Sequence, residues 1–383
     1  MKLKLNKILT TPVINALSSV VAVLVGLLAG FIILLVSNPS QAPQGFLSIL
    51  TGGFSSMRDL GQVLYFATPI IMTGLSVGFS SKTGLFNIGA AGQFIVGAYA
   101  AVLVGVKCTF LPGHLHWIAA LVAAMLAGAI WGAIPGFFKA FFNVNEVIAC
   151  IMTNYIGTYL VNFLITKTMF DSLRNQSMRV TESAIIPKMG MDKVFKEGFN
   201  VSSANSGIFI AIAFAILVYF ILEKTSFGYE LKACGFNREA ARYAGINEKR
   251  SILLSMTIAG ALAGLGGALL YLAGAGRGIT VVDVLAQEGF NGIPVALLGL
   301  NNPIGIIFSG TLVAYLNVGG FNMQLYNFAP QVIEIIIGVI IYFSAFALLV
   351  RGLLNTLKKR KEGETATAVP NEPAAAAGGG AGT

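Results

Sequence analysis

Charged residues are scarce in this sequence of 383 residues. They make up 11% of the chain, whereas an average soluble domain has about 25%. Hydrophobic residues make up 56%. A chain with so few charges and so much apolar material is typical of proteins whose surface faces lipid. The composition therefore predicts an integral membrane protein and excludes an ordinary soluble enzyme or binding module.

Cysteine and histidine are also rare, at three and two residues. Cys108, Cys150 and Cys234 are odd in number and widely separated, so they indicate neither a disulfide framework nor a zinc site. His114 and His116 lie close together in an HLH sequence. Such a pair can belong to a metal site, but an interfacial loop is the interpretation that we favour.

Motifs of enzymes are absent from the sequence. It has no GxxxxGK[ST] stretch to hold ATP phosphates, no GxSxG nucleophile, and no His/Cys/Asp/Glu cluster at metal-ligand spacing. We therefore expect no catalytic residues, no metal and no cofactor in this chain, which we interpret as a non-enzymatic protein.

The excess of basic residues, a net charge of +9, indicates topology. Lysines and arginines occur between and after apolar runs instead of in one patch, so we expect no nucleic-acid partner. Lys2, Lys4 and Lys7 precede the first run, and Arg351 and residues 358–361 follow the last. Because basic residues favour the cytoplasmic side, both termini are predicted to be cytoplasmic, which requires an even number of crossings.

A span needs roughly 20 apolar residues to cross about 30 Å of hydrocarbon. The apolar runs that we predict to be spans are 13–36, 61–80, 85–106, 117–138, 146–166, 207–222, 251–273, 289–300, 303–318 and 331–350. The run 289–300 is too short to cross alone, so it is expected to form a broken or re-entrant pair with the next. The predicted fold is an all-α, polytopic bundle of about ten transmembrane helices, some of them broken or re-entrant.

The domain boundaries follow from this count. Residues 1–12 form a cytoplasmic N-terminus and 13–350 a membrane domain. Within it, 167–206 is an external loop, despite its six basic residues, and 223–250 is a cytoplasmic loop that also has six. Residues 351–383 are basic and then of low complexity, which predicts a disordered cytoplasmic tail.

Glycine pairs with GxxxG spacing occur inside the apolar runs, at Gly26/Gly30, Gly74/Gly78 and Gly260/Gly264. Small residues let helix backbones approach closely in a membrane, where no hydrophobic force drives association. These pairs predict a tightly packed bundle.

One cytoplasmic stretch, GFNREAARYAGI, reads as a short helix with a start and a stop. Asn237 is a good N-cap, Glu239 suits the positive helix end, and Gly245 can take the left-handed position that ends the helix. Ala240, Ala241 and Ala244 would form one small-residue side, with Arg238 and Arg242 together on another. From these residues alone, the stretch is either an element that docks in a partner's cleft or an ordinary solvated loop.

Uncharged polar residues are densest in the run 146–166. Asn154, Thr158 and Asn162 recur every four residues and so share one helix face, with Tyr155 and Tyr159 beside them. Amides, hydroxyls and aromatic rings could hold a neutral polar solute. The same groups could equally hydrogen-bond neighbouring helices to one another.

Asn87 and Gln93, in the glycine-broken FNIGAAGQF, have the same two interpretations. A charge at the centre of a span costs about 2.5–3.5 kcal/mol on insertion scales, and no such charge is evident. The acidic residues that we place near span ends, where solvation is expected, are Glu146, Asp283, Glu288 and Glu334.

The stretch GFNREAARYAGI resembles the cytoplasmic coupling loop of ABC-importer permeases, in which an Ala-Ala pair and a following glycine sit against the ATPase. Three further stretches, GLFNIGAAGQF (84–94), NEVIACIMTNYI (145–156) and GFNGIPVALLGLNNPIG (289–305), resemble permeases for nucleosides and simple sugars. The position of the loop, between the sixth and seventh of ten predicted spans, is similar to that in permeases of the vitamin B12 and branched-chain amino acid type. The resemblance covers about 75–350. The sequence departs from the family pattern at Ala91, where a glutamate is usual.

The resemblance implies a fold similar to that of the vitamin B12-type importer permeases, in the cell membrane of a bacterium. It implies an ABC ATPase that binds ATP and Mg²⁺, a second permease subunit, identical or homologous, and an extracellular substrate-binding protein as partners, besides membrane lipid. The expected ATPase-coupling residues are Asn237, Arg238, Glu239, Ala240, Ala241, Arg242 and Gly245. The expected substrate-path residues are Asn87, Gln93, Asn154, Tyr155 and Thr158.

The expected function is import of a nucleoside, with a simple sugar such as ribose as the alternative within the family. A secondary transporter is the alternative of another class. It would need a coupling-ion site, and usually internal repeats and an intramembrane carboxylate, none of which is evident in the sequence.

Overall fold

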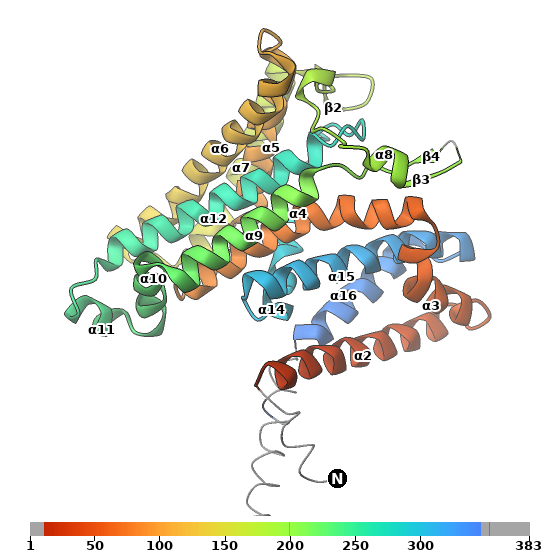
Figure 1. Ribbon diagram of the computed structural model, residues 1–383, viewed down its shortest axis with the longest axis horizontal. Helices are drawn as coiled ribbons and strands as arrows, with labels where there is room; N and C mark the ends of the chain where they lie inside the picture. Colours follow the sequence, from red (N-terminus) through yellow and green to blue (C-terminus); the bar gives the residue numbers. More distant parts are fainter. Residues whose placement is uncertain (1–10, 199, 346–351, 353–383) are drawn as a thin grey trace, which may run out of the picture.

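The computed structural model describes residues 11–198, 200–345 and 352. Most of the predicted N-terminal segment 1–12, the end of the predicted span 331–350 and nearly all of the tail 351–383 lie outside the described residues. Within the described part, the chain is mostly helical, as predicted (Figure 1).

The long helices account for most of the predicted spans. They are α2 (Thr11–Ser37), α4 (Met57–Lys82), α5 (Ala90–Lys107), α6 (Gly113–Phe142), α7 (Glu146–Thr168), α9 (Gly207–Lys224), α12 (Glu248–Tyr271), α15 (Pro303–Asn322) and α16 (Pro330–Ala345). The shorter helices are α3 (Ala42–Thr51), α8 (Met191–Val194), α10 (Ser226–Phe236), α11 (Arg238–Tyr243), α13 (Gln287–Phe290), α14 (Gly292–Leu298) and the 3-10 turns η1 (Gly52–Phe54), η2 (Glu182–Ala184) and η3 (Met323–Tyr326). Two antiparallel ribbons pair β1 (Phe170–Asp171) with β2 (Gln176–Ser177) and β3 (Lys196–Glu197) with β4 (Asn200–Val201).

Seven of the described helices, α4, α5, α6, α7, α9, α12 and α15, are long and apolar enough to cross a membrane. The predicted spans 13–36 and 331–350 correspond to α2 and to α16. The predicted run 289–300 contains no helix that could cross alone. It contains the last two residues of α13 and all of α14, and Asn291 separates the two short helices.

Polar residues at the turns determine where several long helices begin. Ser56 accepts a hydrogen bond from the Asp59 amide at the start of α4, and Asn145 accepts one from the Val147 amide at the start of α7. Asn247 caps α12 in the same way. These side chains satisfy amides that have no partner within the helix.

Two groups of helices pack side by side (Figure 1). The larger contains α5, α6, α7 and α12, and the smaller contains α2, α3, α15 and α16. Helix α4 belongs to both, because it packs against α12 and also against α14 and α15, and α9 packs against α4 and α15. Most of α4 is therefore buried, and the largest hydrophobic core cluster runs along it.

Glycines bring α6 and α12 into backbone contact. A Cβ atom at Gly128 would collide with the carbonyl oxygen of Gly260, and one at Gly264 would lie 2.5 Å from the carbonyl oxygen of Ala124. The predicted close approach at Gly260/Gly264 is thereby confirmed. The pair Gly74/Gly78 on α4 instead faces side chains of α14 and α15.

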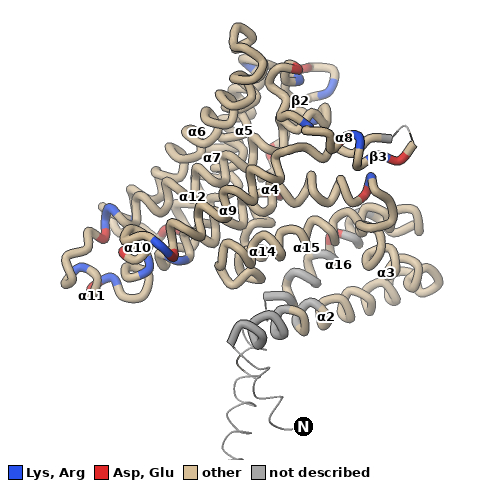
Figure 2. Tube along the Cα trace, in the orientation of Figure 1, with Lys and Arg blue, Asp and Glu red and all other residues tan. Residues whose placement is uncertain are grey.

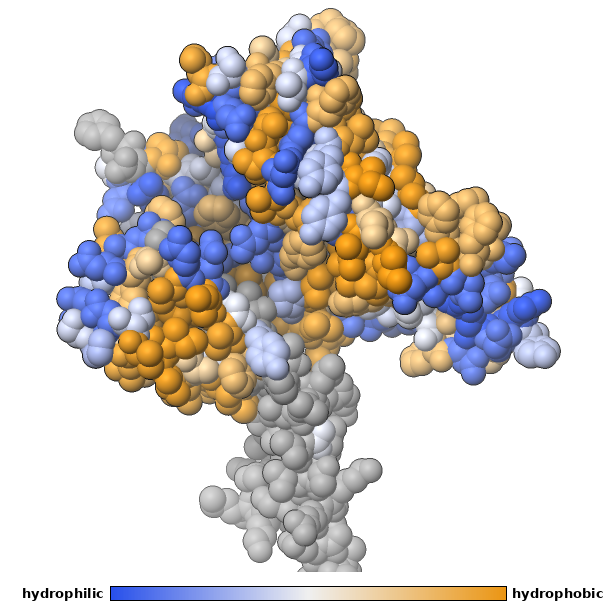
Figure 3. Space-filling model, turned by 180° about the vertical axis from the view of Figure 1, so that it is seen from behind, coloured by the Kyte–Doolittle hydropathy of each residue, from blue (hydrophilic) through white to orange (hydrophobic). Residues whose placement is uncertain are grey.

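Charged residues gather at the two ends of the molecule and are rare between them (Figure 2). One end carries α10 and α11, and the other carries the β-ribbons and α8. From behind, hydrophobic side chains cover much of the surface between the hydrophilic ends, with α10 and α11 at the lower right (Figure 3). The segments 223–250 and 167–206 thus lie at opposite ends of the helices, as two loops on opposite sides of a membrane would.

Candidate functional site

Helix α11 has the start and the stop that the sequence predicts. The side chain of Asn237 accepts a hydrogen bond of 3.0 Å from the amide of Ala240. After the helix, Gly245 takes a left-handed conformation, with φ +83°, and the amide of Ile246 donates to the carbonyl of Ala241. This pattern is a Schellman motif, which glycine favours because it has no Cβ.

The exposed surface of α11 differs from the predicted one. Ala241 is only 3% exposed and packs into the chain, so the expected face of three alanines is incomplete. Phe236 and Tyr243, by contrast, are 91% and 93% exposed. We call the exposed residues Phe236, Ala240, Arg242, Tyr243 and Ala244 the α11 surface. Its two aromatic side chains were missed by the sequence reasoning, although fully exposed aromatics indicate a binding surface.

The two arginines of this region are not equivalent. The Nε atom of Arg238 lies 3.8 Å from the Oε2 atom of Glu248, at the start of α12. Arg242 is exposed, like Glu239. Arg238 therefore contributes to holding α11 against α12, whereas Arg242 can reach a partner.

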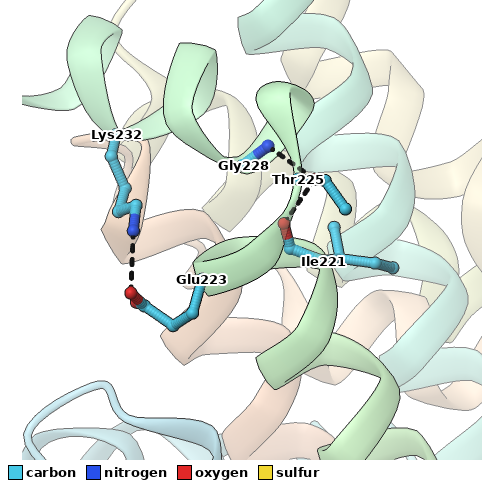
Figure 4. A network of polar contacts seen from close by, with 5 residues as sticks. All are labelled: Ile221, Glu223, Thr225, Gly228 and Lys232. Atoms are coloured by element: carbon cyan, nitrogen blue, oxygen red, sulfur yellow. Dashed lines mark hydrogen bonds and ion pairs between the residues drawn. The ribbon is translucent and has the colours of Figure 1, made fainter.

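Helix α10 is fixed to the end of α9 (Figure 4). The Thr225 hydroxyl donates to the carbonyl of Ile221 at 2.6 Å and accepts from the amide of Gly228 at 3.1 Å. Lys232 and Glu223 form an ion pair at 3.0 Å. The chain thus reverses at Thr225 through defined contacts.

Helix α10 also lies against the end of α4. A Cβ at Gly235 would lie 2.5 Å from the carbonyl oxygen of Lys82 and 3.0 Å from the amide nitrogen of Gly84. The neighbouring Thr83 hydroxyl is 2.6 Å from that of Ser255 on α12. Burial raises the pKa of the Cys234 thiol on α10, so this cysteine is a neutral packing group.

Asn87 and Gln93 form a closed pair of amides between α4 and α5. The Nδ2 atom of Asn87 donates to Oε1 of Gln93 at 2.8 Å, and the Nε2 atom of Gln93 donates back at 3.1 Å. Asn87 also donates to the Ser76 hydroxyl at 3.1 Å. Both amides are buried.

Asn154 connects α7 to the same segment. Its Oδ1 atom accepts from the amide of Gly92 at 2.8 Å, and its Nδ2 atom donates to the carbonyl of Ile88 at 3.0 Å. Thr158 donates to the carbonyl of Asn154. We call Asn87, Gln93, Asn154 and their partners Ser76 and Ile88 the amide cluster. Its hydrogen bonds support the interpretation that these residues join helices.

The other residues of the predicted polar face on α7 have two different environments. Asn162 donates to the carbonyl of Val282 and to the carboxylate of Asp283, in the loop after α12. Tyr155 is 47% exposed, and Tyr159 is exposed beside it. The tyrosines therefore face outward from the chain while Asn154 and Thr158 face inward.

Position 91 lies against the broken helix. A Cβ at Gly289 in α13 would collide with the Cα atom of Ala91, and Ala91 is buried. The side chain at position 91 therefore lies in a tight contact between α5 and α13. Its neighbour there is Gly289, the residue after Glu288.

Glu288 lies in α13, directly before the predicted run 289–300. Its carbonyl accepts a hydrogen bond of 3.1 Å from Thr73 of α4. Its Oε1 atom lies 2.8 Å from Nη2 of Arg277. The Arg277 guanidinium lies 5.9 Å from the ring centre of Tyr271. The ion pair was missed because apolar runs define spans and both residues lie between two of them.

The other three acidic residues that the sequence placed near span ends lie at helix starts or in a loop. Glu146 is the first residue of α7 and pairs with Lys139 of α6 at 2.8 Å. Asp283 lies in the loop after α12, and Glu334 is exposed near the start of α16. These three positions agree with the expectation.

His116 is a structural residue. Its Nδ1 atom lies 2.8 Å from the Ser183 hydroxyl and its Nε2 atom 2.9 Å from the carbonyl of Val104. It belongs to the first turn of α6 instead of a loop. Among the described residues, no group of three or more His, Cys, Asp or Glu side chains could hold a metal ion.

Comparisons with known proteins find relatives along most of this chain. A family model described as branched-chain amino acid transport system / permease component matches residues 60–345. The guanosine ABC transporter permease protein NupP of Bacillus subtilis (strain 168) is 38% identical over 347 residues, 90% of this chain and 97% of that protein. No solved structure matches.

Two further relatives transport different solutes according to their names. The nucleoside ABC transporter permease protein NupB of Lactococcus lactis subsp. cremoris (strain MG1363) is 33% identical, over 91% of this chain and 96% of that protein. The glucose ABC transporter permease protein TsgB13 of Haloferax volcanii is 31% identical, over 78% of each chain. The chain therefore belongs to the branched-chain amino acid transport system / permease component family.

Proposed function

We propose that this chain is the membrane-spanning subunit of an ATP-driven ABC importer that carries nucleosides into a bacterial cell. The observation that carries the proposal is the likeness to guanosine and nucleoside permeases over about nine-tenths of the chain. The glucose permease has lower identity and coverage, which supports nucleosides over the simple-sugar alternative. The chain is a transport subunit and not an enzyme.

The proposal includes several partners. An ABC ATPase, which binds ATP and Mg²⁺, docks on the α11 surface from the cytoplasm. An extracellular binding protein delivers the nucleoside, and a second permease subunit, identical or homologous, completes the path. The exposed aromatics Phe236 and Tyr243 support the docking site, because such side chains are the usual anchors of protein interfaces.

The membrane topology is part of the proposal. Helices α2, α4, α5, α6, α7, α9, α12, α15 and α16 would cross singly, and α13 with α14 would form a tenth, broken crossing. In Figure 1, α2 begins and α16 ends towards the side that carries α10 and α11, which supports cytoplasmic termini. This arrangement is also the one expected of a fold of the vitamin B12 importer type.

Movement of the ATPase would reach the bundle through α10. The contact between Gly235 and Gly84 places α10 directly on the segment that leads into the amide cluster. That cluster holds α7 through Asn154, and Ala91 in the same segment holds α13. A displacement of α10 can therefore be transmitted through these packed contacts to α13, the first part of the broken helix.

We propose that the substrate path runs beside this route. Asn87, Gln93, Asn154 and Thr158 would form its structural wall, and Tyr155 lies on the exposed face of α7. The wall would then change shape when the segment 83–93 moves. Because all four wall residues are buried, their contribution is to the shape of the path, whereas Tyr155 can meet a partner subunit or the solute.

The docking proposal is tested by removing the two exposed anchors. Phe236→Ser with Tyr243→Ser should reduce copurification of the ATPase by more than tenfold, because each anchor at an interface contributes about 2 kcal/mol. Leu173→Ser is the matched control, since Leu173 is 96% exposed at the opposite end. Undiminished copurification and ATP-driven uptake in the double variant would refute the docking site.

A further inference from the structure

We propose that the last two turns of α6 and the start of α12 bind an anionic phospholipid, at the end of the bundle that carries α10 and α11. The acyl chains lie along the outward face of α6, and the phosphate of the headgroup meets Lys249 and Arg250. The inference goes beyond the proposed function, because it depends only on a chain that spans a membrane.

Four phenylalanines gather on one side of α6 near its end. Phe137, Phe138, Phe141 and Phe142 are between 42% and 65% exposed, and we call them the phenylalanine cluster. The ring centres of Phe137 and Phe141 are 4.9 Å apart, and those of Phe138 and Phe142 are 6.1 Å apart. A contiguous apolar patch of this kind marks a contact with another molecule or with a membrane.

The phenylalanine cluster continues a stripe of apolar residues that faces outward along α6. The exposed members of this stripe, at helical spacing, are Val122, Leu126, Ile130, Phe137 and Phe141. Helix α6 has 30 residues and is therefore about 45 Å long, whereas the hydrocarbon of a bilayer is about 30 Å thick. The end of α6 thus extends to the level of the headgroups. Because the stripe is continuous, a molecule within the bilayer covers the cluster from the side.

The start of α12 brings positive charge to the phenylalanine cluster. The Nζ atom of Lys249 lies 5.5 Å from the ring centre of Phe141, within the range of a cation–π contact. One turn further along α12, the Cα atom of Leu253 would lie 3.5 Å from a Cβ at Gly136 of α6. Arg250 follows Lys249, and both are exposed. Two basic residues therefore adjoin the end of the apolar stripe.

Both basic residues are available to an anion. Neither forms an ion pair with a carboxylate in the part of the chain that the structure describes. Two carboxylates of this region already have partners, since Glu146 pairs with Lys139 at 2.8 Å and Glu248 lies 3.8 Å from Arg238. Lysine and arginine both bind phosphate, and basic residues beside a span attract anionic lipids. An apolar stripe that ends at two free cations matches the acyl chains and the headgroup of such a lipid.

The proposed lipid site adjoins the segment that holds α11. Glu248, the residue before Lys249, pairs with Arg238 of α11. Asn247 accepts a hydrogen bond from the Arg250 amide and so caps α12. A lipid bound to Lys249 and Arg250 therefore stabilises the start of α12 and supports the α11 surface.

The test uses the purified full-length chain in detergent, after removal of the lipids that accompany it. Dioleoylphosphatidylglycerol and dioleoylphosphatidylcholine, which share the same acyl chains, are added separately. Native mass spectrometry measures the bound lipid, and the melting temperature is followed in parallel. The wild type should bind the anionic lipid about tenfold more tightly and should melt several degrees higher with it. Lys249→Gln with Arg250→Gln should abolish most of this preference, because each basic residue at an anionic lipid surface contributes about fivefold.

Lys193→Gln with Lys196→Gln is the matched control. It also removes two exposed lysines, but at the opposite end of the molecule, and should keep the preference. If the double glutamine variant does not accumulate, Lys249→Gln alone should lower the preference about fivefold, whereas Lys249→Arg should keep it.

Four results would overturn the inference. The first is equal binding of both lipids by the wild type, and the second is an equal loss of preference in the control pair. The third is the same stabilisation by glycerol 3-phosphate alone, which would indicate a site for a soluble anion. The fourth is a dimer that Phe141→Ser dissociates, which would assign the phenylalanine cluster to a second copy of the chain.

Discussion

At the scale of one residue, Asn154 is a polar side chain within a span whose amide makes its hydrogen bonds to the protein itself. Both ends of its amide are bonded to backbone groups of the segment 88–92. A backbone amide or carbonyl that loses its partner in a buried place costs about 1–3 kcal/mol. Asn154 therefore holds α7 to α5 at a point where neither helix can reach water.

Asn154→Leu should lower the stability of the bundle before it affects transport. The change leaves the amide of Gly92 and the carbonyl of Ile88 unpaired, which predicts a loss of about 2–6 kcal/mol in the free energy of unfolding. The melting temperature and the abundance in membranes should fall. Thr158→Val is the milder control, because that hydroxyl bonds only to a carbonyl of its own helix.

Uptake per folded molecule separates the two interpretations of Asn154. If the leucine variant keeps a normal melting temperature and loses uptake, the amide contacts the solute, and the amide cluster is part of the binding site.

Some features of the site were predictable from neighbouring residues alone. Asn237 as the N-cap of α11 and Gly245 as the residue that ends it depend only on the local sequence. The burial of Ala241 and the exposure of Tyr155 depend on which side of each helix meets another helix. The contact between Glu288 and Thr73 could not be predicted for the same reason, because the two residues are 215 positions apart in sequence.

At the scale of one element, helix α10 is a surface segment that is in direct contact with the long helices α9 and α4. It is fixed to α9 through Thr225 and Glu223, and it touches α4 where Gly235 meets Lys82 and Gly84. The sequence predicted α11 and its loop, but it gave no indication of these contacts. It did predict that the run 289–300 is too short for a span, since length alone is sufficient for that inference.

Gly235→Ala should uncouple ATP hydrolysis from uptake. The added methyl group would push α10 away from the backbone of Lys82, while the side chains of both anchors, Phe236 and Tyr243, are kept. The ATPase should still copurify and hydrolyse ATP, and the amount of nucleoside taken up per ATP should fall several-fold. Gly113→Ala is the control, because the nearest atom to its Cβ would be 3.8 Å away.

An unchanged ratio of uptake to hydrolysis in Gly235→Ala would show that the contact between α10 and α4 is not the route of coupling. Loss of ATPase binding would instead place Gly235 in the docking surface. Either result would redirect the search for the coupling route to α11 and α12, which the ion pair of Arg238 and Glu248 joins.

At the scale of the whole molecule, two charged ends are separated by a hydrophobic middle (Figure 2). The sequence predicted this division from the apolar runs, because the bilayer requires it of any span. The relative packing of the runs was not predictable from one sequence. The grouping of α4 with both sets of helices depends on glycines whose partners lie in distant segments.

The central claim is that this chain moves a nucleoside only when a separate ATPase hydrolyses ATP. The most direct measurement is nucleoside uptake into proteoliposomes that hold the purified permease, its ABC ATPase and its binding protein, with ATP and Mg²⁺ on the ATPase side. We predict uptake that requires all of these components and persists when proton and sodium gradients are abolished. Uptake by the permease alone, driven by an ion gradient without ATP, would contradict the account and identify a secondary transporter.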